Sequence, residues 1–152
     1  MRGPAARSAK HLVPGLDRRF EAVIFDWDGT AVPDRGAAAG GLRACVERLS
    51  ELGVDLAVVS GTHVGNVDGQ LRARPRGPGR LHLLLNRGSE VFLVDETGPS
   101  LVYRRVATPG EDAALTDAAE LAVARLAERG LGTEIVSARL NRRKIDLIPE
   151  PA

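Results

Sequence analysis

Cysteine, lysine and long apolar runs are all scarce in this sequence, and each scarcity narrows what the protein can be. The single cysteine, Cys45, cannot form a disulfide within the chain, so a reducing, cytoplasmic environment fits best. No apolar run approaches the roughly 18 residues that a membrane-spanning helix needs, and we expect no membrane partner. The formal net charge of +1 gives no electrostatic argument for a nucleic-acid partner.

The first 19 residues differ in composition from the rest of the 152-residue chain. This leader is basic, with Asp17 as its one acid, and it lacks the apolar centre of a secretory signal. We expect a flexible tail, with a targeting peptide or a nucleic-acid-binding arm as the alternatives. The remaining residues suffice for one core, or for a small core and a subdomain.

Residues 23–30 are the most informative stretch, because an apolar run ends there in Asp26 and Asp28 and is followed by Gly29 and Thr30. Such a run is typical of a strand buried on both faces of a parallel sheet, whose carboxyl end borders a binding crevice. Two carboxylates this close repel each other unless a divalent cation lies between them and a phosphate. The pattern predicts Mg²⁺ at Asp26 and Asp28, with one acid as nucleophile and the other handling the leaving-group proton. An ordinary acidic turn is the alternative.

A second apolar run, residues 54–59, ends in Ser60, Gly61 and Thr62. The helix predicted between the two runs, residues 34–52, makes the strands parallel and brings Ser60 beside the two aspartates. We expect the hydroxyl groups of Ser60 and Thr30 and the amide of Gly61 to bind phosphate, with Thr30 also able to hold the turn. Alternatively, Ser60 or Thr62 only caps the next helix.

The remaining pattern alternates between strands and helices. Asp34 is predicted to cap the first helix, whose apolar face holds Leu42, Cys45, Val46, Leu49 and Leu52. We then expect a third strand at 81–85, a hairpin at 91–94 and 101–106, and a helix from Thr108 to Arg129 opened by a capping box. A final strand pair is predicted at 134–138 and 144–148.

The octet around Asp26 closely resembles the first motif of the haloacid dehalogenase (HAD) superfamily of phosphohydrolases, and Ser60 resembles the second. The resemblance implies that Asp26 forms an aspartyl-phosphate, that Asp28 is the general acid/base and that Mg²⁺ is the cofactor. The element order resembles the subgroup with an α+β cap after the third core strand, which includes trehalose-phosphate and other sugar-phosphate phosphatases. It implies an α/β fold: a partial, Rossmann-like parallel core of three strands at 20–88 and a cap at 89–152. The implied substrate is a sugar phosphate or similar small metabolite.

The family also has a catalytic lysine and a late acidic strand end after the cap, and this sequence shows neither. Its only lysines are Lys10, before the nucleophile, and Lys144, inside the last hairpin. Glu111 and Asp112 with Asp117 imitate the late motif, but the capping box explains the same residues. We therefore expect the N-terminal part of a phosphatase, truncated at its C-terminus, with weak or no turnover and an exposed edge at residues 23–25. A complementing C-terminal core half is a possible partner.

Two further readings stay open. The chain is either this hydrolase or a non-catalytic module that binds phosphate or a partner; nucleic-acid binding through the arginines is a weaker third option. Four basic residues near the last hairpin are either substrate contacts or a solvated tip: Arg139, Arg142, Arg143 and Lys144.

Overall fold

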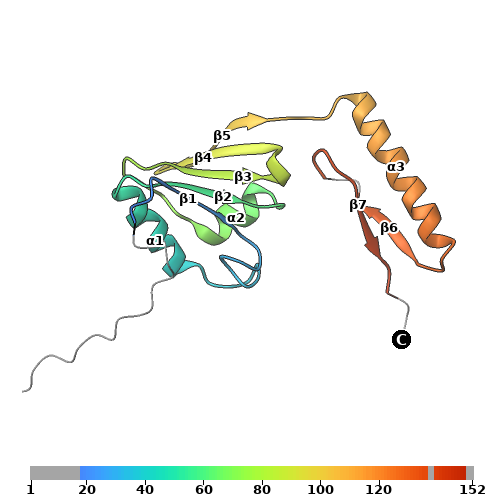
Figure 1. Cartoon of the computed structure of the whole chain (residues 1–152), viewed down its shortest axis with the longest axis horizontal. Helices are drawn as coiled ribbons and strands as arrows, with labels where there is room; N and C mark the ends of the chain where they lie inside the picture. Colours follow the sequence, from blue (N-terminus) through green and yellow to red (C-terminus); the bar gives the residue numbers. More distant parts are fainter. Residues whose placement is uncertain (1–17, 137–138, 150–152) are drawn as a thin grey trace, which may run out of the picture.

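A computed structural model of the chain describes residues 18–136 and 139–149, which form a five-stranded sheet with two helices and a separate two-stranded sheet with one helix (Figure 1). The expected leader lies outside the described residues up to position 17. The elements are β1 (Ala22–Asp26), α1 (Gly40–Glu51), β2 (Asp55–Val59), α2 (Val64–Leu71), β3 (Leu81–Leu85), η1 (Asn86–Gly88), β4 (Glu90–Asp95), β5 (Gly98–Arg104), α3 (Pro109–Ala127), β6 (Thr133–Val136) and β7 (Lys144–Leu147).

Strands β1, β2 and β3 are parallel neighbours, as the sequence predicts. The register pairs Asp26 with Val59 and Val59 with Leu84, so the three strands end at one edge of the sheet. This places the residues that follow each strand side by side, which is the arrangement a binding crevice requires.

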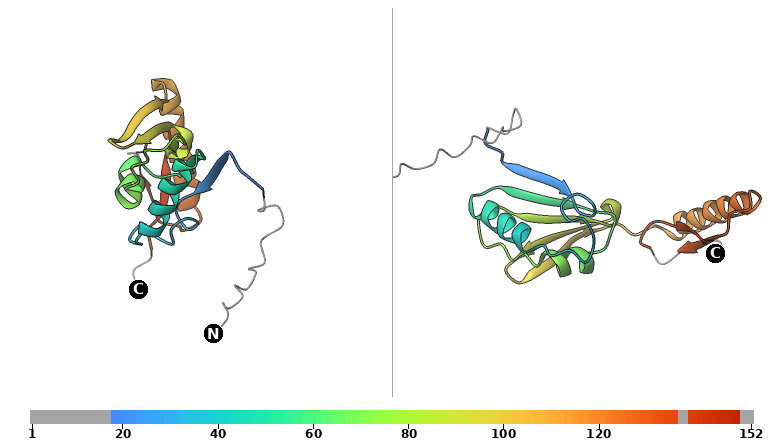
Figure 2. Two further views of the ribbon diagram at one scale, coloured as in Figure 1. Left: turned by 90° about the vertical axis from the view of Figure 1, so that its left-hand side faces the viewer. Right: turned by 90° about the horizontal axis from the view of Figure 1, so that it is seen from below.

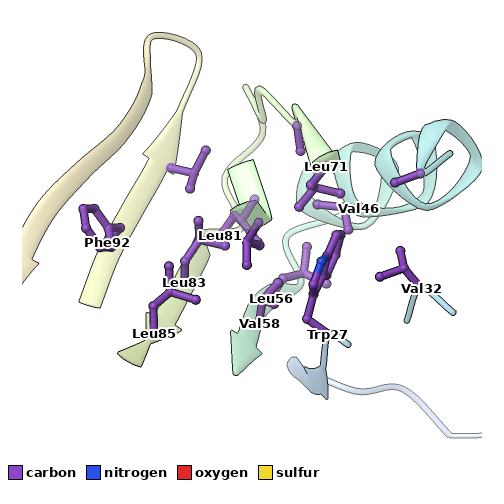
Figure 3. Packing of buried hydrophobic residues seen from close by; sticks show 14 residues of the cluster. Trp27, Val32, Val46, Leu56, Val58, Leu71, Leu81, Leu83, Leu85 and Phe92 are labelled. Carbon is purple, nitrogen blue, oxygen red and sulfur yellow. The ribbon is translucent and has the colours of Figure 1, made fainter. Parts of the chain in front are cut away.

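The hydrophobic core lies on one face of this sheet, under α1 and α2 (Figure 3). It consists of alternate residues of the strands together with residues of the helices and of the turn after β1, among them Trp27, Val46, Leu56, Val58, Val67, Leu71, Leu81, Leu83, Leu85 and Phe92. On the opposite face, Ile24 is 71% exposed and Val59 is 38% exposed. The prediction that the first strand is buried on both faces is therefore wrong, because β1 is an edge strand with one covered face.

Helix α1 begins at Gly40, six residues later than predicted. Asp34 does not cap it: its Oδ1 accepts a hydrogen bond from the Gly36 N–H at 2.7 Å, which holds a local turn instead. Val46 is buried, but Cys45 is exposed and Leu52 lies at the C-cap. The Asp34 carboxylate could accept a hydrogen bond from the backbone of either a turn or a helix start, and in this chain it does so in the turn.

The hairpin of β4 and β5 belongs to the core sheet, where β4 pairs antiparallel with β3. Its inward residues, Glu90, Phe92 and Val94, continue the buried rows of β3. The expected boundary between core and cap after Gly88 thus falls within the sheet, and the second unit follows the linker at 105–108 (Figure 2). The alternation of apolar residues in the sequence predicts a hairpin, but it does not predict which other strand the hairpin pairs with.

The second unit consists of α3 on the β6–β7 hairpin. The predicted capping box is confirmed: the Thr108 hydroxyl accepts from the Glu111 N–H at 3.3 Å, and the Glu111 carboxylate accepts from the Thr108 N–H at 2.8 Å. These acids therefore serve the helix start, and the late-motif reading of the same residues is not supported. The expected strand end at 137–138 lies outside the described residues, and within them no helix is long and apolar enough to cross a membrane.

Candidate active site

The turn after β1 is fixed by its own backbone. The Trp27 carbonyl accepts from the N–H groups of Ala31 and Val32 at 3.0 and 3.2 Å, and the Gly29 N–H donates to the Val32 carbonyl at 2.8 Å. Gly29 has a φ of +77°, which a glycine adopts without steric cost. The Thr30 hydroxyl donates to Asp26 Oδ2 at 3.0 Å, so Thr30 holds the turn onto the strand end.

Trp27 anchors this turn in the core between the two aspartates. Its side chain is 1% exposed, and its Nε1–H donates to Gln70 Oε1 on α2 at 3.0 Å. The amide of Gln70 in turn donates to the carbonyls of Asp34 and Ala37 at 2.9 and 2.8 Å. With the indole anchored in this way, Asp26 and Asp28 on either side of it remain exposed at the strand end.

Ser60 is buried at the end of β2 and faces the turn. Its hydroxyl donates to Asp28 Oδ2 at 3.4 Å and accepts from the Thr62 N–H at 3.2 Å. The alternative reading of Ser60 or Thr62 as a helix cap does not hold, because the N-cap of α2 is His63 and it makes no side-chain capping bond. The structure thus brings Asp28 and Ser60 into contact, with Asp26 and Thr30 on the adjacent strand end.

Few charges of the described residues neutralise the two aspartates. Arg35 Nε lies 3.8 Å from Asp28 Oδ1, but both side chains are exposed, so this pair contributes little. No group of three or more acidic, histidine or cysteine side chains that could hold a metal occurs within the described residues. Two carboxylates at one strand end still suit Mg²⁺, which often binds one or two protein carboxylates and completes its shell with water and substrate phosphate.

Gly61 follows Ser60 and lies beneath two arginines. A Cβ built at Gly61 would stand 3.8 Å from both Arg142 Nη1 and Arg87 Nε. Arg142 comes from the β6–β7 connection and Arg87 from η1, so the second unit reaches the core here. By contrast, Arg143 pairs with Asp112 at 2.8 Å, and Lys144 pairs with Asp146 at 2.6 Å within β7.

No protein-family model and no curated protein sequence matches the chain. Among solved structures it is similar to an N-terminally truncated, IMP-bound IMP-nucleotidase of Plasmodium falciparum, with a TM-score of 0.56 and 16% identity over 86% of this chain and 40% of that one. It is also similar to the HAD phosphatase BT1666 of Bacteroides thetaiotaomicron, with a TM-score of 0.47 and 16% identity over 93% of this chain and 47% of that one. The chain shares a mixed α/β fold with the nucleotidase structure. The chain spans less than half the length of both structures.

The parallel pairing of β1 and β2 accounts for the positions of the predicted site residues, but sequence reasoning missed three residues that shape the site. Trp27 and Gln70 fix the turn. The only feature of the sequence that could have indicated Gln70 is that it is a polar residue on the buried side of α2. Arg87 was missed because its partner over Gly61, Arg142, is 55 positions away in the sequence. Nothing in local spacing indicates a contact of that kind.

Proposed function

We propose that the chain carries the nucleophile and phosphate-binding half of a HAD-type phosphatase acting on phosphate monoesters. The single observation that carries the proposal is the contact between Asp28, in the turn after β1, and Ser60, directly after β2. Asp26, the last residue of β1, pairs with Val59 on the neighbouring strand. Two acids and a buried hydroxyl at one strand edge form a constellation suited to receiving a phosphoryl group.

In this proposal Asp26 attacks phosphorus, and the bond from phosphorus to the ester oxygen breaks. Asp28, protonated at this point, gives its proton to that oxygen. The resulting carboxylate then takes a proton from a water molecule as the water oxygen bonds to phosphorus and the bond from phosphorus to Asp26 breaks. The Ser60 hydroxyl and the Gly61 N–H would hold the phosphoryl oxygens. Asp26 and Asp28 would hold Mg²⁺, which when bound supplies positive charge against the phosphate.

The proposed substrate is a small phosphorylated metabolite such as a sugar phosphate, and the proposed location is the cytoplasm. The similarity to a nucleotidase that binds IMP adds a nucleoside monophosphate to the candidates. Among the described residues Lys144 is the one lysine, and it pairs with Asp146 in β7. We therefore expect slow turnover, because a cation that steadies the phosphorylated aspartate would have to come from elsewhere.

The test compares phosphate release from a panel of sugar phosphates and IMP, with Mg²⁺ and with chelator, by wild type and Asp26→Asn. We expect release only by wild type with Mg²⁺, and a phosphorylated form of wild type in intact-mass spectra. Asp117→Asn is the matched control, since Asp117 is an exposed acid on α3. Equal rates in wild type and Asp26→Asn would eliminate the proposal.

A second candidate is a non-catalytic module that binds a partner strand. The observation that favours it is the free side of β1, which pairs only with β2 among the described residues and exposes Ile24. Such an edge offers unpaired backbone groups to another strand, including one from a complementing core half. Turnover that disappears in Asp26→Asn would decide for the enzyme.

A further inference from the structure

Three arginines from both units meet beside the proposed phosphate site. Arg87 belongs to η1, and its backbone N–H donates to the Ser60 carbonyl at 3.4 Å, while the N–H of Asn86 donates to the Thr62 carbonyl at 2.9 Å. The segment that carries Arg87 is therefore attached directly to the Ser60–Thr62 turn. Arg87 itself has a φ of +58°, a conformation that arginine rarely adopts.

The other two arginines reach this place because the β6–β7 connection docks on the core. Asn141, at a φ of +54°, donates through Nδ2 to Ser89 Oγ at 2.9 Å and accepts through Oδ1 from the Ala107 N–H at 2.6 Å. In Figure 1 this connection is the part of the second unit that faces the core sheet. Arg139 and Arg142, on either side of Asn141, are thereby held half-buried at the junction.

These arginines lack the partners that other arginines of the chain have. Arg74, Arg104 and Arg143 each pair with a carboxylate. Within the described residues, no ion pair is formed by Arg87, Arg139 or Arg142, and the Nε of Arg139 is buried without a hydrogen-bond partner. Burial, and then the charges of Arg87 and Arg139, lower the pKa of Arg142 below its ordinary value. Clustered cations without an anion are unfavourable, and a bound anion would relieve both the repulsion and the unpaired donor.

We propose that Arg87, Arg139 and Arg142 bind a second anionic group of the substrate, a phosphate or a carboxylate, while Asp26, Asp28 and Ser60 hold the reacting phosphate. This inference rests on the proposed function. Within the described residues neither aspartate forms an ion pair with these arginines: Asp28 contacts Ser60, whereas Arg87 and Arg142 lie over Gly61. Planar guanidinium groups bind phosphate and carboxylate through paired hydrogen bonds, and Gly61 adds no side chain beneath them.

The test measures binding by calorimetry at low salt, in the full chain carrying Asp26→Asn so that no ligand is consumed. The ligands are fructose 6-phosphate, fructose 1,6-bisphosphate and 6-phosphogluconate, which differ in having no second anion, a second phosphate or a carboxylate. Even one net hydrogen bond to a charged group predicts binding of a doubly anionic ligand about tenfold to a hundredfold tighter than the monophosphate. Tighter binding of the bisphosphate identifies the second anionic group as a phosphate, and tighter binding of 6-phosphogluconate identifies it as a carboxylate.

Arg142→Gln and, separately, Arg87→Gln should abolish this preference and leave binding of the monophosphate within about twofold. Arg125→Gln is the matched control, because Arg125 is exposed on α3 and loses the same charge. Equal affinity of all three ligands, or a preference that persists in both arginine variants, would overturn the inference even if wild type hydrolyses the monophosphate. A preference that depends on Arg142, in a chain whose wild type shows no turnover, would overturn the proposed function and support the anion site.

Discussion

Replacement of Trp27 by phenylalanine should destabilise the chain by about 2–3 kcal/mol. The change removes the hydrogen bond to Gln70, worth about 1 kcal/mol, and the part of the indole ring that phenyl lacks, worth about 1–2 kcal/mol. The indole is 1% exposed, so nearly all of this apolar area is buried in the folded state. For comparison, Trp27→Ala should cost about 3–5 kcal/mol, which approaches the whole stability of a marginal domain.

Urea unfolding followed by far-ultraviolet circular dichroism measures this change as a lower midpoint at constant slope. Tyr103→Phe is the control, since Tyr103 is an exposed aromatic on β5 and should change stability by less than about 0.5 kcal/mol. A double-mutant cycle with Gln70→Ala should show a coupling of about 0.5–1.5 kcal/mol between the two side chains.

The same substitution should lower any turnover under conditions in which the variant is still folded. Trp27 lies between Asp26 and Asp28, and a displacement of reacting groups by about 1 Å can cost up to a hundredfold in rate. A Trp27→Phe variant with the stability and turnover of wild type would show that the indole does not position the two acids, and the account of the turn given above would be refuted.

Three further predictions concern other elements of the chain. Glu90→Ala should lower the free energy of unfolding, measured with urea, by about 1–2 kcal/mol, because it removes the buried carboxylate that pairs with Arg104. The cost stays moderate because the Arg104 side chain can return to water. An unchanged free energy of unfolding would show that the pair is not formed. The pKa of Glu111 lies below its ordinary value of 4.5, owing first to the hydrogen bond that its carboxylate accepts from the Thr108 backbone N–H. The capping box should therefore stabilise α3 fully above its ordinary pKa of 4.5 and lose this contribution as the pH falls through the lower folded-state pKa. Helicity that falls with pH equally in Glu111→Gln would refute this. Ile24→Lys should slow aggregation, measured by light scattering, without changing the unfolding midpoint by more than about 0.5 kcal/mol; unchanged aggregation would exclude β1 as the associating edge.

The sequence predicts much of this fold because several elements are encoded by local rules. The strand at 81–85 is found within its predicted bounds, and the start of α3 follows from the capping box and Pro109. The start of α1 could not be predicted in this way, since Asp34 satisfies a turn as readily as a helix. The pairing of β4 with β3 was also missed, because partner choice depends on which apolar faces meet in space.

The residues of the candidate site also fall into those that local sequence rules predict and those that depend on contacts distant in the sequence. Asp26, Asp28, Ser60 and Gly61 could be proposed from sequence because each lies directly after an apolar run, and parallel strands bring their carboxyl ends to one edge. The position of Arg142 over Gly61 depends instead on a docking contact made by Asn141, between segments joined through a linker.

That docking contact has a consequence for how the two units work together. Asn141 makes its bonds to Ser89 of the core and to Ala107 of the linker, so the position of Arg142 depends on one side chain whose amide is oriented by both partners. Asn141→Ala should therefore release Arg142 from Gly61 and weaken binding of a doubly anionic ligand while leaving Asp26, Asp28, Ser60 and Arg87 in place. Monophosphate affinity is the internal control. If Asn141→Ala preserves the preference for a second anion, Arg142 does not depend on this contact for its position.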